Sequence, residues 1–175
     1  MSSGVKTEIA YCRRCGSSVT AHDSHFVCTN GHTIYVNAAP AVGILIFNNT
    51  GKLLIGERVL DPHKGLLDFP GGFCEQTETL ESAVAREVQE ETGLRPNQYS
   101  TPVFILSGVD DYDYAGETIH VVAAVFRAIL LDDNTPVQSN DDITQLRFMD
   151  MQDVVAADIA FPSLRSAFLR VKGGS

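Results

Sequence analysis

The sequence predicts an α+β domain that follows a short cysteine-rich segment. Three observations support this: β-prone segments on both sides of one acidic helix, an amphipathic helix near the C-terminus, and three cysteines close together near the N-terminus. With 175 residues, 44% of them hydrophobic, the chain can bury one sizeable core and carry a small appendage. We therefore expect two domains, residues 1–37 and residues 38–175.

The composition argues against several classes of function. A formal net charge of −9 opposes broad electrostatic binding to nucleic acid or to an anionic membrane. The longest apolar run, residues 38–47, is far shorter than the ~20 residues that a membrane span needs. The first ten residues lack the apolar core of a signal peptide. We expect a cytoplasmic protein, and a homodimer is compatible with the sequence.

The N-terminal segment contains a set of metal-ligating residues in the spacing C-x2-C-x12-C-x3-H, formed by Cys12, Cys15, Cys28 and His32. Two ligands from each of two tight turns suit tetrahedral zinc better than a disulfide framework. A segment this short has few large apolar residues, so a bound metal would supply much of its stability, on the order of 10 kcal/mol. The sequence therefore predicts a zinc ribbon with a structural Zn2+. Whether His32 is the fourth ligand stays open, with His22 and His25 as the alternatives.

The rest of the chain shows the strand and helix patterns of the larger domain. The predicted strands are residues 41–47, 52–59, 101–109, 119–131 and 146–149. A strong turn at residues 48–51 predicts that the first two strands form a hairpin. The polar run 110–117 predicts a loop. Pro162 opens a final amphipathic helix that ends at Gly173.

The helix that begins near Leu80 carries acidic residues on a face that should be buried. At 100° per residue, Glu87 and Glu91 fall inside its apolar stripe and Glu90 lies at the edge. Two like charges about 4 Å apart repel by roughly 4 kcal/mol at an effective dielectric near 20, and burial adds a desolvation cost. Protonation or a cation must relieve this. Clustered carboxylate oxygens suit a hard ion such as Mg2+ or Mn2+.

The same stretch, residues 72–94, resembles the signature of the Nudix hydrolases, G-x5-E-x7-R-E-U-x-E-E-x-G-U, where U is a bulky aliphatic residue. It matches at every defined position: Gly72, Glu78, Arg86, Glu87, Val88, Glu90, Glu91, Gly93 and Leu94. The resemblance extends over roughly residues 38–170. It implies a Nudix fold, a mixed sheet between helices. It also implies an enzyme acting on acid anhydrides, which uses Mg2+ or Mn2+ to split the pyrophosphate of a nucleoside diphosphate linked to another moiety.

The resemblance also implies roles for individual residues. Arg86 is expected to orient Glu87 or to pair with Glu78, and Arg58 is a candidate ligand for the substrate phosphates. The general base stays open among the three glutamates of the helix, Glu117 and Asp142. The implied ligands of Mg2+ or Mn2+ are the Gly72 carbonyl, Glu87, Glu90, Glu91 and Asp142.

The substrate is less well defined by the sequence. A zinc ribbon before a Nudix domain is similar to the NADH diphosphatases, but the Ser-Gln-Pro-Trp array of that group is absent. The proline that marks many ADP-ribose hydrolases is replaced by Asp110. Tyr112 matches a tyrosine typical of dinucleoside polyphosphate hydrolases, and Tyr112 and Tyr114 could stack on a base. We expect a small-molecule nucleotide substrate such as ADP-ribose, NADH or FAD.

A second reading is a non-catalytic Nudix sensor, in which the zinc ribbon contacts a protein or a nucleic acid. Such sensors tend to lose metal carboxylates, and none is missing in this sequence. The segment before residue 37 has three basic residues, Lys6, Arg13 and Arg14, too few to dominate binding to nucleic acid.

Overall fold

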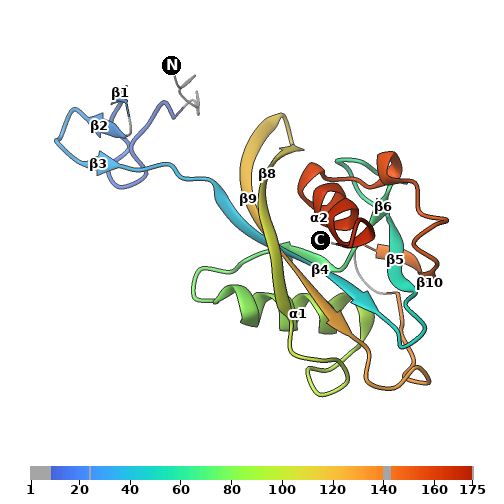
Figure 1. Ribbon diagram of the computed structural model, residues 1–175. Helices are drawn as coiled ribbons and strands as arrows, with labels where there is room; N and C mark the ends of the chain where they lie inside the picture. The colour runs from blue at the N-terminus through green and yellow to red at the C-terminus, as the bar shows by residue number, and fades with distance from the viewer. Residues whose placement is uncertain (1–8, 24, 140–142, 175) are drawn as a thin grey trace. The chain divides into compact units, whose positions relative to one another are not determined.

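The computed structural model describes residues 9–23, 25–139 and 143–174. The chain folds as two units, residues 1–37 and residues 38–175 (Figure 1). Each unit has its own core. None of the helices within the described residues has the length and apolar character needed to cross a membrane.

The N-terminal unit is a three-stranded antiparallel sheet in the order β1-β2-β3. Its strands are β1 Val19–Ala21, β2 Phe26–Cys28 and β3 Thr33–Ile34. One tight turn precedes β1, where Gly16 donates its N–H to the Cys12 carbonyl, and another connects β2 to β3, where Gly31 donates to the Cys28 carbonyl, both at 2.8 Å. Both glycines have φ above +70°, a conformation that residues with a Cβ rarely adopt. The buried hydrophobic side chains are few: Cys12, Cys28 and Ile34, with Ile9, Val19 and Phe26 packed against them.

The C-terminal unit is a mixed sheet with a helix on each face (Figure 1). Its elements are β4 Ala39–Phe47, β5 Leu53–Arg58, β6 Leu67–Asp68, β7 Gly71–Phe73, α1 Leu80–Thr92, β8 Val103–Tyr114, β9 Glu117–Ile129, β10 Ile143–Met149, a 3-10 turn Ala156–Asp158, and α2 Pro162–Lys172. The strand order is β10-β5-β4-β9-β8, in which β4 and β9 run parallel and the other neighbours antiparallel. The predicted α+β fold class is confirmed.

Strand β4 is buried on both faces, which explains its almost continuous apolar sequence. Ile44 and Ile46 face α1 and pack with Val84 and Val88. Leu45 faces α2 and belongs to the second core cluster. Parallel pairing with β9 along the whole of β4 makes this strand the centre of the unit.

The predicted turn at residues 48–51 is present, because Asn48 Oδ1 accepts hydrogen bonds from the N–H groups of Thr50 and Lys52. The strands that it joins pair in register at one position, Phe47 with Leu53, and then diverge. Into the gap come two short strands that the sequence did not predict, β7 against β4 and β6 against β5. The divergence therefore opens the middle of the sheet, where the segment around Gly71 enters.

The predicted loop at residues 110–117 is wrong. Strands β8 and β9 continue as a long hairpin, and the connection is the pair Ala115–Gly116, both with positive φ (Figure 1). The polar residues that indicated a loop pair across the strands instead. Asp113 accepts a hydrogen bond from Thr118 at 2.6 Å, and Asp111 Oδ1 lies 2.7 Å from His120 Nδ1.

Gly71 gives a direct test of this arrangement. A Cβ at Gly71 would collide with the Val42 carbonyl oxygen and would lie 2.7 Å from the Gly43 Cα, and both are backbone atoms that cannot move aside. Gly71→Ala is expected to lower the free energy of unfolding by about 3 kcal/mol, measured by denaturant titration.

Gly65→Ala is the matched control, because Gly65 has φ +84° with no atom near its Cβ position. Backbone strain alone should cost this variant about 1 kcal/mol. Equal losses in the two variants would contradict the close packing of β7 on β4.

Candidate active site

Helix α1 is fixed at both ends by its own sequence. The Thr79 hydroxyl accepts a hydrogen bond from the N–H of Ser82, and the Ser82 hydroxyl accepts one from the N–H of Thr79. Together the two bonds form a capping box. Gly93 ends the helix in the left-handed conformation, with φ 74°, and donates its N–H to the Gln89 carbonyl. These caps set which face of α1 meets the sheet, and Glu91 is buried on that face at 4% exposure.

Arg86 connects the acidic residues around α1. Its Nε and Nη2 bind the two oxygens of Glu78 at 2.8 and 2.9 Å, a two-pronged pairing that fits the guanidinium plane. Its Nη1 donates to Glu87 Oε1 at 2.7 Å and to Glu90 Oε2 at 3.0 Å. Its Nη2 also donates to the Phe73 carbonyl. One side chain thus orients three carboxylates and ties α1 to β7.

The charges in this network shift each other's pKa values. Hydrogen bonds from Arg86 lower the pKa of Glu78 to about 2, and Glu78 in turn raises the pKa of Arg86. Burial raises the pKa of Glu87, although Arg86 opposes that shift. Glu78 is therefore held as a carboxylate, whereas burial favours the protonated form of Glu87.

Two glycines of β7 bring the backbone against the buried glutamates. The N–H of Gly71 donates to Glu91 Oε2 at 2.8 Å. A Cβ at Gly72 would lie 2.5 Å from Glu87 Oε1, so a side chain there would displace this carboxylate. Gly71 thus pairs with Glu91 through its N–H, and Gly72 leaves room for the Glu87 carboxylate beneath the strand.

The donor set of α1 fits a hard divalent cation. Glu87, Glu90 and Glu91 offer carboxylate oxygens, and the hydrogen bonds to Arg86 engage one oxygen each of Glu87 and Glu90. Such oxygens suit Mg2+ or Mn2+. Each carboxylate is oriented by a protein group, Arg86 or the Gly71 N–H, so the arrangement does not depend on contact between the acids themselves.

A pocket of about 270 Å³ joins these glutamates to the other predicted residues. Its lining includes most of the site predicted from the sequence: Gly72, Arg86, Glu87, Glu90, Glu91, Arg58 and Tyr112. Tyr114 is absent from the lining and is 62% exposed, its ring centre 6.3 Å from that of Tyr112. Glu117 is exposed at the start of β9. Asp142 lies outside the described residues.

Arg58 is held rigidly at the side of this pocket. Its Nη1 pairs with Asp68 Oδ2 at 2.6 Å, its Nε donates to the Pro62 carbonyl at 2.8 Å, and its guanidinium lies 4.9 Å from the ring centre of Phe161. Burial raises the pKa of Asp68, and the charge of Arg58 opposes this shift. Sequence reasoning missed Asp68, although an acid inside the apolar run Leu66 to Phe69 is a signal of a buried pair.

The aromatic side of the pocket contains Phe161, which the sequence did not predict. Its ring is close to parallel with Tyr112, at 18° and 6.1 Å between centroids. Phe73 meets Tyr112 edge-on at 5.3 Å. These residues lie on three segments far apart in the sequence, so only the fold reveals their contact.

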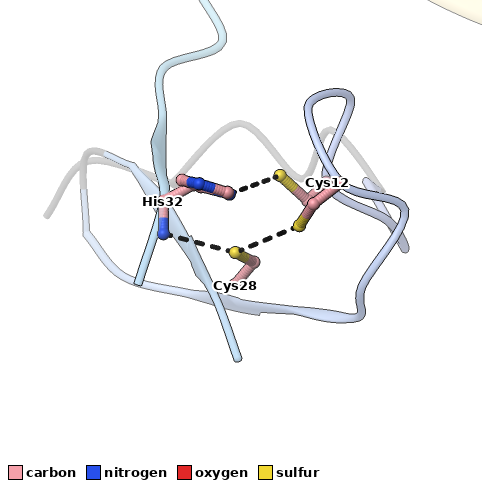
Figure 2. A group of neighbouring side chains, drawn as sticks. Cys12, Cys28 and His32 are labelled. Atoms are coloured by element: carbon pink, nitrogen blue, oxygen red, sulfur yellow. Dashed lines mark hydrogen bonds between the residues drawn. The ribbon is translucent and has the colours of Figure 1, made fainter. Parts of the chain in front are cut away.

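The N-terminal unit brings the Cys/His set together. The ligand atoms of Cys12, Cys15, Cys28 and His32 all lie within 4.8 Å of one another. Figure 2 shows Cys12, Cys28 and His32 pointing toward a common centre. The Sγ atoms of Cys15 and Cys28 are 3.8 Å apart, and Cys12 Sγ is 3.7 Å from His32 Nδ1. A zinc tetrahedron with bonds of about 2.3 Å places its sulfurs about 3.8 Å apart, so this geometry fits zinc.

The surroundings of two of the sulfurs differ. Hydrogen bonding with Ser17 lowers the pKa of Cys15 to about 5, which favours the thiolate that binds metal, whereas burial raises the pKa of Cys28. The N–H of His32 donates to Cys28 Sγ at 3.3 Å. His22 and His25, the alternative ligands, stack on each other with centroids 5.0 Å apart and are not part of this group.

Comparison with known proteins gives the family. The model of the NUDIX domain matches residues 37–170, and the chain belongs to that family. An ADP-ribose pyrophosphatase from Methanocaldococcus jannaschii is 33% identical over 150 residues, which cover 82% of this chain and 80% of the relative. An 8-oxo-dGTP diphosphatase from Escherichia coli is 48% identical over 61 residues, 34% of this chain and 46% of the relative.

A solved structure has the same architecture. The structure of a NUDIX hydrolase from Nitrosomonas europaea superposes with a TM-score of 0.69 at 25% sequence identity, covering 95% of this chain and 94% of its own. The similarity thus spans nearly the whole length of both proteins.

The lowered pKa of Glu78 predicts a pH dependence of stability. Because its pKa in the folded protein, about 2, is below the ordinary value of 4.5, the stability that this group contributes is complete above pH 4.5. It is lost as the pH falls toward 2. Glu78→Gln should be less stable than the unmodified protein at pH 6, and the difference in melting temperature should shrink between pH 4.5 and 2. Glu81→Gln, exposed in the first turn of α1, is the control. A constant difference at all pH values would contradict the Arg86–Glu78 pairing.

The Cys/His geometry predicts a metal content. Protein purified without chelator is expected to contain about one equivalent of zinc by elemental analysis, because four ligands complete one tetrahedral site. Cys28→Ser should lose this zinc. Cys74→Ser should keep it, since Cys74 lies outside the cluster. Less than half an equivalent in the unmodified protein would contradict the site.

Proposed function

We propose that this protein hydrolyses the pyrophosphate of a nucleoside diphosphate linked to another moiety, with ADP-ribose as the first candidate and NADH and FAD as further ones. The products would be a nucleoside monophosphate and a phosphorylated second moiety. The observation that supports this most directly is that one pocket contains the oriented glutamates of α1, a fixed arginine and several aromatic rings, among them Tyr112 and Phe161. The relative named as an ADP-ribose pyrophosphatase matches over most of both chains, which favours this substrate class.

The glutamates would hold the catalytic cation. When bound at Glu87, Glu90 and Glu91, Mg2+ or Mn2+ would supply charge neutralisation for the phosphates and would acidify a bound water. The chain's own contribution is to place these carboxylates. Arg86 fixes Glu87 and Glu90, and the Gly71 N–H fixes Glu91. The Gly72 carbonyl and Asp142 are further proposed ligands.

Hydrolysis also needs a group that accepts the proton of the attacking water. The glutamates that line the pocket, Glu87, Glu90 and Glu91, are the candidates within the described residues. Exposed Glu117 is disfavoured, since it does not line the pocket. Arg86 would act as a positioning residue for Glu87.

The substrate itself would be bound by the rest of the pocket. Arg58 carries a charge that stays on its guanidinium, and Asp68 and the Pro62 carbonyl hold it in one geometry. Such a group suits phosphate oxygens, and its attachment to buried residues limits the entropy lost on binding. Tyr112 offers an aromatic face to a planar ring of the substrate, and Tyr114 remains a weaker candidate because it is exposed outside the pocket.

The N-terminal unit would hold a structural Zn2+ through Cys12, Cys15, Cys28 and His32. With so small a hydrophobic core, this unit would depend on the metal for most of its stability. We place no catalytic role on it, because the candidate site lies among residues 41–164.

The function is tested by a substrate panel with product identification. The protein should release AMP from ADP-ribose, NADH or FAD when Mg2+ or Mn2+ is present and should show no turnover with chelator. Glu91→Gln is expected to lower kcat by at least about 100-fold. The glutamine oxygen can still accept the Gly71 N–H, so the change removes the charge and keeps this hydrogen bond.

Glu81→Gln should keep full activity, since Glu81 is exposed and absent from the pocket lining. Tight binding of these nucleotides without turnover would instead support a non-catalytic sensor. Undiminished activity of Glu91→Gln would contradict the assignment of the site.

A further inference from the structure

Alternate residues of strand β8 contact the start of helix α2. Gly108, Asp110 and Tyr112 point to the same face of the strand, and all three contact the segment from Phe161 to Ser163. A Cβ at Gly108 would lie 2.8 Å from the Ser163 Cβ, so the glycine allows the helix end to approach the strand closely. The residues between them, such as Val109 at 77% exposure, point away.

Asp110 supplies the helix cap that α2 lacks in its own sequence. The residue before the helix is Phe161, whose side chain cannot accept a hydrogen bond, and Pro162 occupies the first turn. Asp110 Oδ1 accepts the Ser163 N–H at 2.9 Å, and Oδ2 accepts the Ser163 hydroxyl at 2.5 Å. Asp110 is 7% exposed and Ser163 is 3% exposed, so this carboxylate is buried at the positive end of the helix.

This cap holds Ser163, two residues after Phe161, against β8. The ring of Phe161 is covered by the Arg58 guanidinium at 4.9 Å and touched edge-on by His63 at 5.2 Å. Tyr112 lies next to it with nearly parallel planes. Both rings line the pocket that also contains the glutamates of α1. We call the pair Tyr112 and Phe161 the two-ring wall.

We propose that the two-ring wall is the subsite for a planar ring of the substrate, a nucleobase or a nicotinamide, and that Asp110 is the positioning residue that sets this specificity. The proposal rests on the proposed function. It adds that Phe161 contacts the planar ring of the substrate. Stacking makes little demand on the identity of the ring, because every base has a flat π-face. The wall therefore selects substrates with a planar ring over purely sugar-phosphate compounds, and it tolerates different bases.

Fluorescence tests the wall without requiring turnover. The sequence has no tryptophan, so Phe161→Trp introduces a single one at the wall. Adding AMP or GMP in the presence of Mg2+ should quench its emission saturably, with dissociation constants within about fivefold of each other because stacking is insensitive to base identity. Ribose 5-phosphate, which lacks the ring, should leave the emission unchanged at the same concentrations.

Phe104→Trp is the matched control. Phe104 also contacts another ring, that of Phe126, but it is 55% exposed and does not line the pocket. Its tryptophan should not respond to AMP. Equal quenching in both variants would overturn the proposal, because it would show that AMP does not act through the wall.

Asp110 is tested in the Phe161→Trp background. Asp110→Ala and Tyr112→Leu should each raise the AMP dissociation constant by about 10-fold, the size of one stacking contact. Asp113→Ala, an exposed position of the same strand, should leave it unchanged. In otherwise unmodified protein, Asp110→Ala should raise KM for ADP-ribose while kcat stays within a few-fold, a split that general loss of structure would not give. Melting curves show whether each variant remains folded, and Tyr112→Leu tests the wall independently of the cap.

The outcomes separate this proposal from the proposed function. Hydrolysis of ADP-ribose without any AMP-dependent change in the emission of Phe161→Trp would overturn the wall and leave the enzyme assignment standing. Unchanged AMP binding in folded Asp110→Ala would overturn the role of Asp110. Neither binding nor turnover of any nucleotide would overturn both.

Discussion

The candidate site depends on holding carboxylates on the face of a helix that packs against the sheet. Glu87 and Glu91 lie on the face of α1 that meets the sheet, where apolar residues would be the stable choice. Arg86 on one side and the backbone of Gly71 and Gly72 on the other make this placement tolerable, through hydrogen bonds and by the absence of side chains. This placement of Glu87 and Glu91 is consistent with the helix caps, with the position of β7 and with the shape of the pocket.

The sheet provides the room for that arrangement. Because β4 and β5 separate after a single pair in register, the segment from β6 to β7 can enter between them and lie beneath α1. The same opening places Asp68 at the end of β6, where it fixes Arg58. The acidic and basic sides of the pocket are thus set by one irregularity of the sheet, and α2 closes the pocket with Phe161 and Leu164.

Local patterns in the sequence are sufficient to predict the acidic side of the pocket and the Cys/His group. Helical periodicity locates the three glutamates, capping residues set the ends of α1, and the cysteine spacing groups four ligands that the fold brings together. The fold class follows from the strand and helix patterns, with the signature specifying the mixed sheet. Each of these signals lies in a short stretch of sequence or in a fixed motif, so no long-range pairing has to be known.

The expectations that were wrong or incomplete concern residues that act through contacts distant in the sequence. The run 110–117 predicts a loop because its aspartates are polar, yet Asp111 and Asp113 find partners across the hairpin that composition alone does not show. Phe161 becomes visible only through its contact with Tyr112, which is 49 residues away in the chain. Asp68 lies in an apolar run that signals a buried acid, but its partner Arg58 emerges only from the fold. Residues that act through tertiary contacts carry weak local signals, which is why the binding side of the pocket is harder to predict than the acidic side.

The alternation along β8 has a consequence for how such a pocket can change over evolution. Gly108, Asp110 and Tyr112 serve α2 only while they share one face of the strand. Inserting or deleting one residue in this strand would turn all three outward and bring Val109 and Asp111 toward the helix. Single substitutions that preserve strand length keep this alternation, and a change of length at the turn of Ala115 and Gly116 leaves it intact as well.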